Sequence, residues 1–213
     1  MSVFLRNLQK RVVFDSAVLV RDAKYLMQLL RLDKFDVSVV CTGGKLIKSL
    51  NLKYRKRNVQ TDILAFPYFE NVKPGILPKP SNPHEYNIGD IILGMHVIEK
   101  DCNEQQKSMH EYLPVLIAHG LCHLLGYTHD TKDSLIQMHK KESEILTAFN
   151  ELTGYSTAPL TPSADLIDKP DGETFLEYQY KPPVPAGSSN ARYDKVLQRY
   201  LVESQRKNSP DMD

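Results

Sequence analysis

The chain has 213 residues, of which 41% are hydrophobic, and its 27 Lys or Arg nearly balance its 26 Asp or Glu. This length and composition are typical of one globular domain with an appendage, and no run of about twenty apolar residues is present that would span a membrane. Three cysteines, widely spaced and odd in number, argue against a disulfide scaffold and favour a reducing compartment.

The apolar pattern of the first 154 residues predicts a small α+β domain. Strands are expected at 3–8, 35–41, 63–67 and 90–94, and helices at 16–32, 44–54, 96–102, 111–125 and 131–152. Ser16 is the expected N-cap of the first helix, and Pro114 is expected in the first turn of the fourth, where a missing N–H is harmless. Four prolines indicate that residues 70–86 are a surface loop. We therefore expect a small mixed sheet packed against helices.

The composition changes after Gly154. Seven of the thirteen prolines follow this residue, and acidic side chains outnumber basic ones there. We therefore assign residues 1–154 to the folded domain and residues 155–213 to a proline-rich, acidic, largely disordered tail, so a chain that ends at Gly154 is expected to fold and keep its site. The apolar spacing at 191–206 is that of an amphipathic helix, which either docks on the domain or a partner or frays without a function.

One eleven-residue run spaces three imidazoles as a metal site needs them: His119-Gly-Leu-Cys-His123-Leu-Leu-Gly126-Tyr-Thr-His129. On an α-helix, His119 and His123 project from one face, about 40° apart. Gly126 can take the left-handed conformation that ends a helix, so the chain can turn back and bring His129 to the same ion. Three neutral nitrogens with an open fourth position predict a catalytic Zn²⁺ site that holds one ion per chain.

The run is similar to the metzincin pattern H-E-x-x-H-x-x-G-x-x-H, in which the glutamate is the general base. Gly120 stands in place of that glutamate, which argues against a metallopeptidase. Cys122 precedes a histidine, but a helix turns its side chain about 100° away, so we expect a core residue. Met138, a candidate for a Met-turn, lies in a helical pattern and is also expected in the core.

Three further motifs precede the histidine run: Asn51-Leu-Lys-Tyr54-Arg55, Thr61-Asp62-Ile-Leu-Ala65-Phe-Pro67 and Gly89-Asp90-Ile. The four motifs in this order, over roughly residues 1–154, resemble the YbeY family of metal-dependent endoribonucleases of bacteria and organelles. The resemblance implies a mixed sheet packed against helices and a zinc ion held by the three histidines. It also implies a role in ribosomal RNA maturation and ribosome quality control, with single-stranded or ribosomal RNA as substrate and ribosomal small-subunit proteins as partners.

Two features depart from the family pattern. Ala65 stands where the family usually has serine, so a local hydrogen bond of the family lacks its hydroxyl here. The loop at 70–86 is longer than in bacterial members, which we expect to alter contacts with substrate or partner.

The same resemblance makes Arg55 the functional arginine near the metal. The chemistry agrees, because Zn²⁺ lowers the pKa of bound water and polarises a phosphoryl oxygen, while a guanidinium matches two oxygens of a phosphodiester that gains charge during in-line attack. The sequence alone explains Arg55 equally well as a surface charge in the basic run 55–57. Protons are handled by the RNA 2′-hydroxyl, Asp62, Asp90 or Asp130, and Asp62 and Asp90 are equally well explained as turn or supporting residues.

Three functions remain open from the sequence: a single-strand endoribonuclease, which we favour, a metzincin-like metallopeptidase, and a non-catalytic zinc-containing ribosome-assembly factor. The long loop and tail favour a eukaryotic member of the family and hence a mitochondrial location, with the cytoplasm as the alternative. Acidic residues interrupt the basic ones near the N-terminus, so these do not define a transit peptide. The basic residues are Arg6, Lys10, Arg11 and Arg21.

Overall fold

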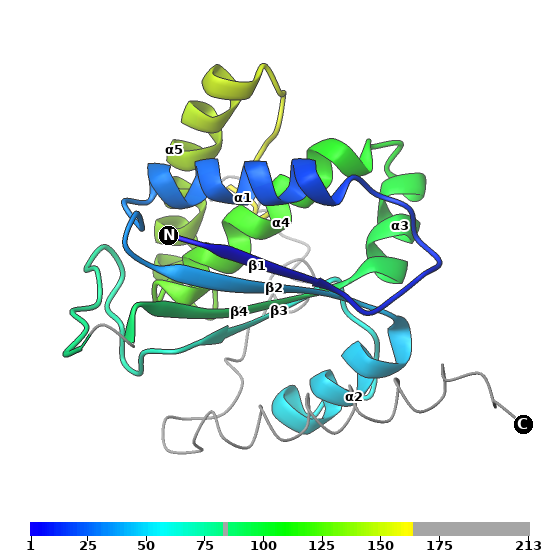
Figure 1. Cartoon of the computed structure of the whole chain (residues 1–213), viewed down its shortest axis with the longest axis horizontal. Helices are drawn as coiled ribbons and strands as arrows, with labels where there is room; N and C mark the ends of the chain where they lie inside the picture. Colours follow the sequence, from blue (N-terminus) through cyan, green and yellow to red (C-terminus); the bar gives the residue numbers. More distant parts are fainter. Residues whose placement is uncertain (83–84, 164–213) are drawn as a thin grey trace, which may run out of the picture. The chain divides into compact units, whose positions relative to one another are not determined.

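The four predicted strands pair into one mixed sheet, which confirms the expected α+β class (Figure 1). The computed structural model describes residues 1–82 and 85–163. The strands are β1 Val3–Asn7, β2 Asp36–Thr42, β3 Ile63–Pro67 and β4 Asn87–Gly94. Their order across the sheet is β1-β2-β4-β3; β1 and β4 run parallel to β2, and β3 runs antiparallel to β4.

Helices cover both faces of this sheet (Figure 1). They are α1 Ser16–Leu29, α2 Gly44–Arg55, α3 Met95–Glu104, α4 Met109–Leu124 and α5 Lys132–Thr153. Because side chains alternate across a strand, Ile91 of β4 contacts α4 on one face while Ile92 points to the face that carries α2, and both are fully buried. None of the described helices is long and apolar enough to cross a membrane.

Helix α4 is the centre of the domain. Every residue from Tyr112 to Leu124 is buried, because the sheet, α1, α3 and α5 pack around the helix. A helix that is apolar on all sides is typical of such a position. The polar exceptions on its inner turns are His119 and His123, so the sequence places two imidazoles in the most enclosed element of the fold.

The cap of α1 differs from the prediction by one residue. The N-cap is Asp15, not Ser16, because the Asp15 carboxylate accepts hydrogen bonds from the backbone N–H groups of Ala17 and Val18 at 2.9 and 3.1 Å. A carboxylate at the N-terminus also compensates the positive end of the helix dipole, which a serine hydroxyl does less well.

Helix α4 also begins two residues before the predicted start at 111. The helix begins at Met109, since the N–H groups of Glu111 and Tyr112 already bond to the Ser108 carbonyl at 3.1 and 3.0 Å. Pro114 therefore lies in the second turn of the helix, where it removes one backbone hydrogen bond. Strand β4 likewise begins earlier than expected, at Asn87, because its first residues pair with β2 and β3.

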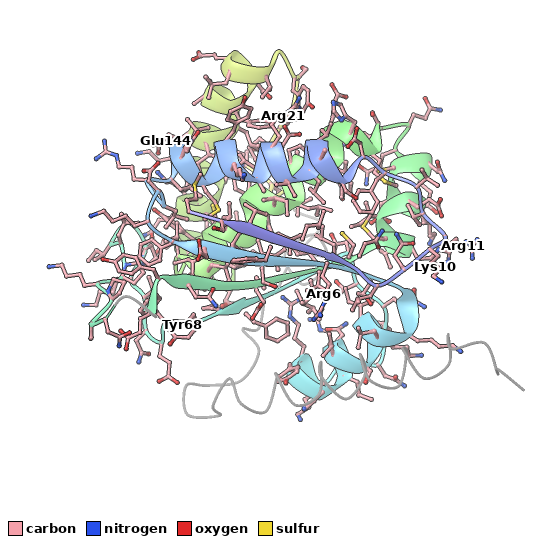
Figure 2. The ribbon with its side chains drawn as sticks, viewed as in Figure 1. Arg6, Lys10, Arg11, Arg21, Tyr68 and Glu144 are labelled. Atoms are coloured by element: carbon pink, nitrogen blue, oxygen red, sulfur yellow. The ribbon has the colours of Figure 1, made fainter. Side chains whose placement is uncertain are left out.

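The basic residues near the N-terminus lie on β1, on α1 and in the loop between them (Figure 2). Arg6 is an exposed residue of β1, and Lys10 and Arg11 are exposed in the loop that follows it. Arg21 of α1 pairs with the buried carboxylate of Asp22 at 2.7 Å. This part of the chain is therefore built into the sheet and its first helix.

Packing continues beyond the end of α5. Gly154 takes a left-handed conformation with φ of 75°, and the chain turns back along the helix (Figure 1). Tyr155 and Leu160 pack against the core, and Thr161 is only 2% exposed. The domain boundary predicted at 154 thus precedes residues that contact the domain. The amphipathic helix predicted at 191–206 lies outside the described residues.

Candidate metal centre

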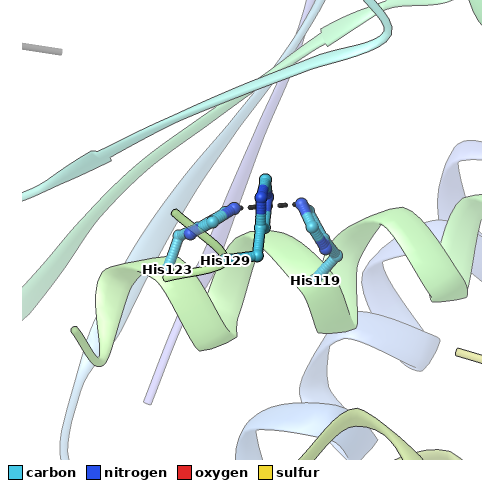
Figure 3. Close-up of side chains that lie close together, drawn as sticks. All are labelled: His119, His123 and His129. Carbon is cyan, nitrogen blue, oxygen red and sulfur yellow. Dashed lines mark hydrogen bonds between the residues drawn. The ribbon is translucent and has the colours of Figure 1, made fainter. Parts of the chain in front are cut away.

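Three imidazole rings meet at the C-terminal end of α4 (Figure 3). One ligand nitrogen from each of His119, His123 and His129 lies within 4.8 Å of the others. The Nε2 atoms of His119 and His123, which are one helical turn apart, are separated by 3.0 Å. All three rings are buried, with exposed fractions between 4% and 9%. The predicted convergence of these histidines is therefore present in the fold.

The turn after α4 brings in the third histidine. Gly126 has a φ of 83°, and the backbone N–H groups of Gly126 and Tyr127 bond to the carbonyls of His123 and Cys122, each at 3.0 Å. These bonds close the helix end as a left-handed cap does. A Cβ at position 126 would lie 2.0 Å from the Val72 carbonyl oxygen. The turn therefore requires glycine both for its backbone conformation and because the loop at 70–86 approaches so closely.

Hydrogen bonds on the far side of two rings fix which nitrogen is available. His123 Nδ1 lies 2.9 Å from the Tyr127 carbonyl oxygen, and His119 Nδ1 lies 2.7 Å from Glu142 Oε1. Both partners are acceptors, so each Nδ1 carries a hydrogen and Nε2 is the nitrogen that each ring directs into the cluster. Two facing lone pairs 3.0 Å apart suit a cation between them, so this donor set fits a transition metal such as zinc.

The Glu142 carboxylate is 1% exposed, and both of its oxygens accept hydrogen bonds. The Thr161 backbone N–H donates to Oε2 at 2.9 Å, and the Thr161 hydroxyl donates to Oε1 at 2.9 Å. Burial acts to raise the pKa of Glu142, but the interaction with His119 and the two bonds from Thr161 outweigh it and hold the pKa below its ordinary value. Glu142 is therefore an ionised acceptor beside the ring of His119.

The protonation state of His123 suits a metal ligand. Burial lowers its pKa well below the ordinary value for histidine, and the neighbouring His119, His129 and Arg55 lower it further. A neutral ring keeps its lone pair for a cation, whereas a protonated one has none to offer. Arg55 contributes to this effect, so its charge acts on the cluster.

Arg55 lines the same cleft as the three histidines, a space of about 330 Å³. It is half-buried at the C-terminus of α2, where Lys56 ends the helix in a left-handed conformation with φ of 60°. Arg57 lines the cleft as well. The structure thus brings the predicted arginine and the predicted ligands together across some seventy residues of sequence.

The three candidate aspartates differ in position. Asp62 lines the cleft, and its Oδ1 accepts hydrogen bonds from the Thr61 hydroxyl at 3.0 Å and from the Ile63 N–H at 2.7 Å. Asp90 and Asp130 are not among the described residues that line it. Asp90 is half-buried on β4 beside Ile91, so alternation directs it to the sheet face opposite α4.

Three neighbours of the histidines prove to be packing residues. A Cβ at Gly120 would lie 2.9 Å from Ile91 Cδ1, so this position faces the sheet and has no space for a larger side chain. Cys122 is fully buried, and burial raises the pKa of its thiol well above the ordinary value. Met138 is also fully buried and belongs to the core, as predicted for both residues.

Sequence reasoning missed Glu142 and Thr161. A signal for Glu142 was present, because it occupies the buried stripe of α5 between Met138 and Leu146, where an apolar residue is expected. A carboxylate on the inner face of a helix marks a paired or ligand-supporting group. Thr161 carried no comparable signal, since its role depends entirely on how the chain folds back after Gly154.

The chain is similar to known proteins over most of its folded part. The family described as "Endoribonuclease YbeY" matches residues 6–150. An Endoribonuclease YbeY of Homo sapiens is 40% identical over 161 residues, which are 76% of this chain and 96% of the human protein. One from Acetivibrio thermocellus is 28% identical over 159 residues, which are 70% of this chain and 98% of that protein.

Among solved structures, the solution structure of TM1509 from Thermotoga maritima aligns with a TM-score of 0.44 at 20% sequence identity. The alignment covers 75% of this chain and 99% of that one. The family match spans well over half of the chain, and the human relative is matched almost from end to end. The chain therefore belongs to the YbeY family of endoribonucleases.

Proposed function

We propose that this protein is a zinc-dependent endoribonuclease that hydrolyses phosphodiester bonds of single-stranded RNA. The observation that carries the proposal is that His119, His123 and His129 converge in a cleft that Arg55 also lines, with Nε2 of His119 and of His123 facing the cluster. Three histidines leave one position of a tetrahedral ion for water or substrate, which is the ligand count of catalytic zinc sites.

The chemistry divides between the ion and the chain. When bound, zinc supplies a Lewis acid and an activated water molecule. Arg55 and Arg57 supply positive charge to the same cleft, where a planar guanidinium can bind two non-bridging oxygens of a phosphate. Because negative charge on those oxygens grows towards the transition state, a fixed arginine accelerates the reaction more than it tightens RNA binding.

A carboxylate beside the phosphate site handles the proton of the attacking group. We assign this role to Asp62, because it lines the cleft while Asp90 and Asp130 do not appear among the described lining residues. The Thr61 hydroxyl and the Ile63 N–H hold its Oδ1 in place, which orients the carboxylate. Asp62→Asn keeps these contacts and removes the base, so it should lower cleavage without lowering metal content.

The packing of Gly120 argues against a metallopeptidase. Peptide hydrolysis at a histidine site of this spacing uses a glutamate at position 120, and here that position is glycine pressed against Ile91 and Ile63. Glycine has no side chain, so position 120 supplies no carboxylate to the cleft. We therefore keep the peptidase only as an outcome of the test below.

The experiment uses the purified full-length protein with labelled single-stranded RNA, duplex RNA and casein, each with and without a zinc chelator. The proposal predicts cleavage of single-stranded RNA alone, its loss on chelation, and its return when Zn²⁺ is added back. Cleavage of casein would favour the peptidase. Tight zinc binding without cleavage of any substrate would favour the non-catalytic assembly factor.

Ribosomal RNA processing and ribosome quality control, contact with ribosomal small-subunit proteins and a mitochondrial location complete the proposal. Their support is membership of the YbeY family and the similarity to a human member over most of the chain. Imaging of the tagged full-length protein tests the location, and association with small-subunit particles on a gradient tests the partner. A purely cytosolic signal or no association would overturn the corresponding part.

A further inference from the structure

The segment after α5 forms a short strap, residues 155–161, that runs back along its own helix. Asn150 holds its middle: the Asn150 side-chain amide donates to the Thr157 carbonyl at 2.9 Å, and Asn150 Oδ1 accepts from the Thr157 N–H at 3.0 Å. His139 Nδ1 donates to the Thr161 carbonyl at 2.7 Å, and this bond holds the end of the strap. The strap is therefore attached at two levels of α5 and ends beside the metal centre.

The end of the strap reaches the site through one carboxylate. Glu142 accepts three hydrogen bonds, and two of them come from Thr161. The third comes from His119 Nδ1, so Thr161, Glu142 and His119 form a continuous chain of hydrogen bonds of 2.7 to 2.9 Å. Leu160 and Thr161 also line the cleft that the three histidines share.

Both carboxylate oxygens are occupied and the group is 1% exposed, so Glu142 has no freedom to rotate away from the ring. A buried carboxylate without donors is costly, which means that Thr161 stabilises the group that in turn fixes the ring. A ring fixed with its hydrogen on Nδ1 presents Nε2 to the ion.

We propose that Glu142 and Thr161 are positioning residues of the metal centre, and that the strap 155–161 is therefore part of the working domain. Glu142 sets the tautomer and orientation of His119, and Thr161 holds Glu142 for that task. The inference rests on the proposed three-histidine metal site, but it does not depend on RNA being the substrate.

The test measures Zn²⁺ affinity of full-length variants by competition with a colorimetric chelator, together with the melting temperature of each metal-free protein. Glu142→Gln keeps the shape of the side chain and removes its charge, and Thr161→Val keeps the shape of threonine and removes its hydroxyl. We expect Glu142→Gln to weaken Zn²⁺ binding by roughly 10- to 100-fold, the range typical of lost ligand-supporting partners. Thr161→Val should weaken it by roughly 10-fold, and Thr161→Ser, which keeps the hydroxyl, should restore it.

Thr157→Val is the matched control. It removes a strap hydroxyl that bonds to Asn150 Oδ1 at 2.7 Å but does not contact Glu142. If the strap only stabilises the fold, Thr157→Val and Thr161→Val should lower the metal-free melting temperature alike and leave Zn²⁺ affinity unchanged, which would overturn the inference. Wild-type affinity in Glu142→Gln would overturn it as well. Weakened affinity in both site variants, but not in the control, supports it even if the wild-type protein does not cut RNA, in which case the proposed function alone fails.

Discussion

The two helical ligands of the metal centre are supported by different parts of the molecule. His123 Nδ1 bonds to the carbonyl of Tyr127, only four residues further along, in the turn that ends α4. His119 Nδ1 bonds to Glu142, which is 23 residues away on α5 and is itself held by Thr161, a further 19 residues along. The first support forms with the helix and its turn. The second exists only when α5 and the strap have docked.

The difference separates two ways in which the site can fail. A change in the turn after α4 acts on His123 and His129 together, because both depend on the backbone path around Gly126. A change in α5 or the strap acts on His119 and leaves the turn intact. The site therefore combines a locally formed turn, which positions His123 and His129, with His119, whose orientation depends on the packing of α5 and the strap.

The largest expected effect comes from removing a ligand, whichever way it is supported. His123→Ala should lower metal affinity by orders of magnitude, because two of three histidines make a poor site. His119→Ala should do the same, since the two supports differ but the ligand roles do not. Metal analysis after dialysis measures both variants. Full retention of metal by either one would remove that histidine from the ligand set.

Arg55 should behave differently from every residue that supports the ligands. Arg55→Ala should lower single-turnover cleavage by roughly 10²-fold or more, the scale of one preorganised electrostatic contact, while metal content and melting temperature stay nearly unchanged. Arg55→Lys should recover part of the loss, because it keeps the charge without the planar fork. Equal cleavage by Arg55→Ala and the wild type would make Arg55 an ordinary surface charge.

Substitution of two glycines with similar backbone angles compares the turn after α4 with the start of the strap. Gly126 and Gly154 have φ of 83° and 75°. A Cβ at Gly126 would lie 2.0 Å from the Val72 carbonyl oxygen, whereas a Cβ at Gly154 would have no described atom outside its own helix and its chain neighbours within 4 Å. Gly154→Ala should lower the unfolding free energy of the metal-free protein by about 1–2 kcal/mol, the cost of the left-handed conformation. Gly126→Ala should cost more and should also weaken metal binding.

Urea unfolding of the metal-free proteins and chelator competition measure these two effects. Equal destabilisation by the two substitutions would contradict this prediction, because it would mean that the loop at 70–86 moves away from a Cβ at position 126 without a cost in free energy.

The smallest effect is expected at Cys122, which is next to a ligand but faces the core. Burial raises the pKa of this thiol well above its ordinary value, so at pH 8 the thiolate is a far smaller fraction than in an exposed cysteine. Native protein should therefore resist alkylation at Cys122 until it is unfolded, and Cys122→Ala should keep its metal affinity. Rapid alkylation of the folded metal-free protein, or loss of metal in the alanine variant, would contradict this placement.

The parts of the site that the sequence predicts are those built by neighbouring residues. His119, His123 and the left-handed turn at Gly126 follow from helix geometry and the properties of glycine, and the structure places them as expected. The predicted strands and helices form for the same local reasons, with shifts such as Asp15 replacing Ser16 as the cap where two capping residues are adjacent.

The rest depends on contacts between distant segments. The carboxylate of Glu142 on the inner face of α5, the return of the chain to Thr161 and the approach of Val72 to Gly126 are all set by tertiary packing. A periodic apolar pattern predicts that α5 exists but not what its buried glutamate contacts. The contacts of residues 155–161 with α5 depend on tertiary packing in the same way, and the proline content after Gly154 does not indicate them.

A titration of the metal-free, full-length protein with Zn²⁺ tests the central claim most directly, with cleavage of labelled single-stranded RNA measured at each step. Cleavage should be absent without metal, should rise in proportion to added Zn²⁺ until one ion is bound per chain, and should stay absent in His123→Ala. Full-rate cleavage by the metal-free protein, or an unchanged titration curve in His123→Ala, would contradict the account.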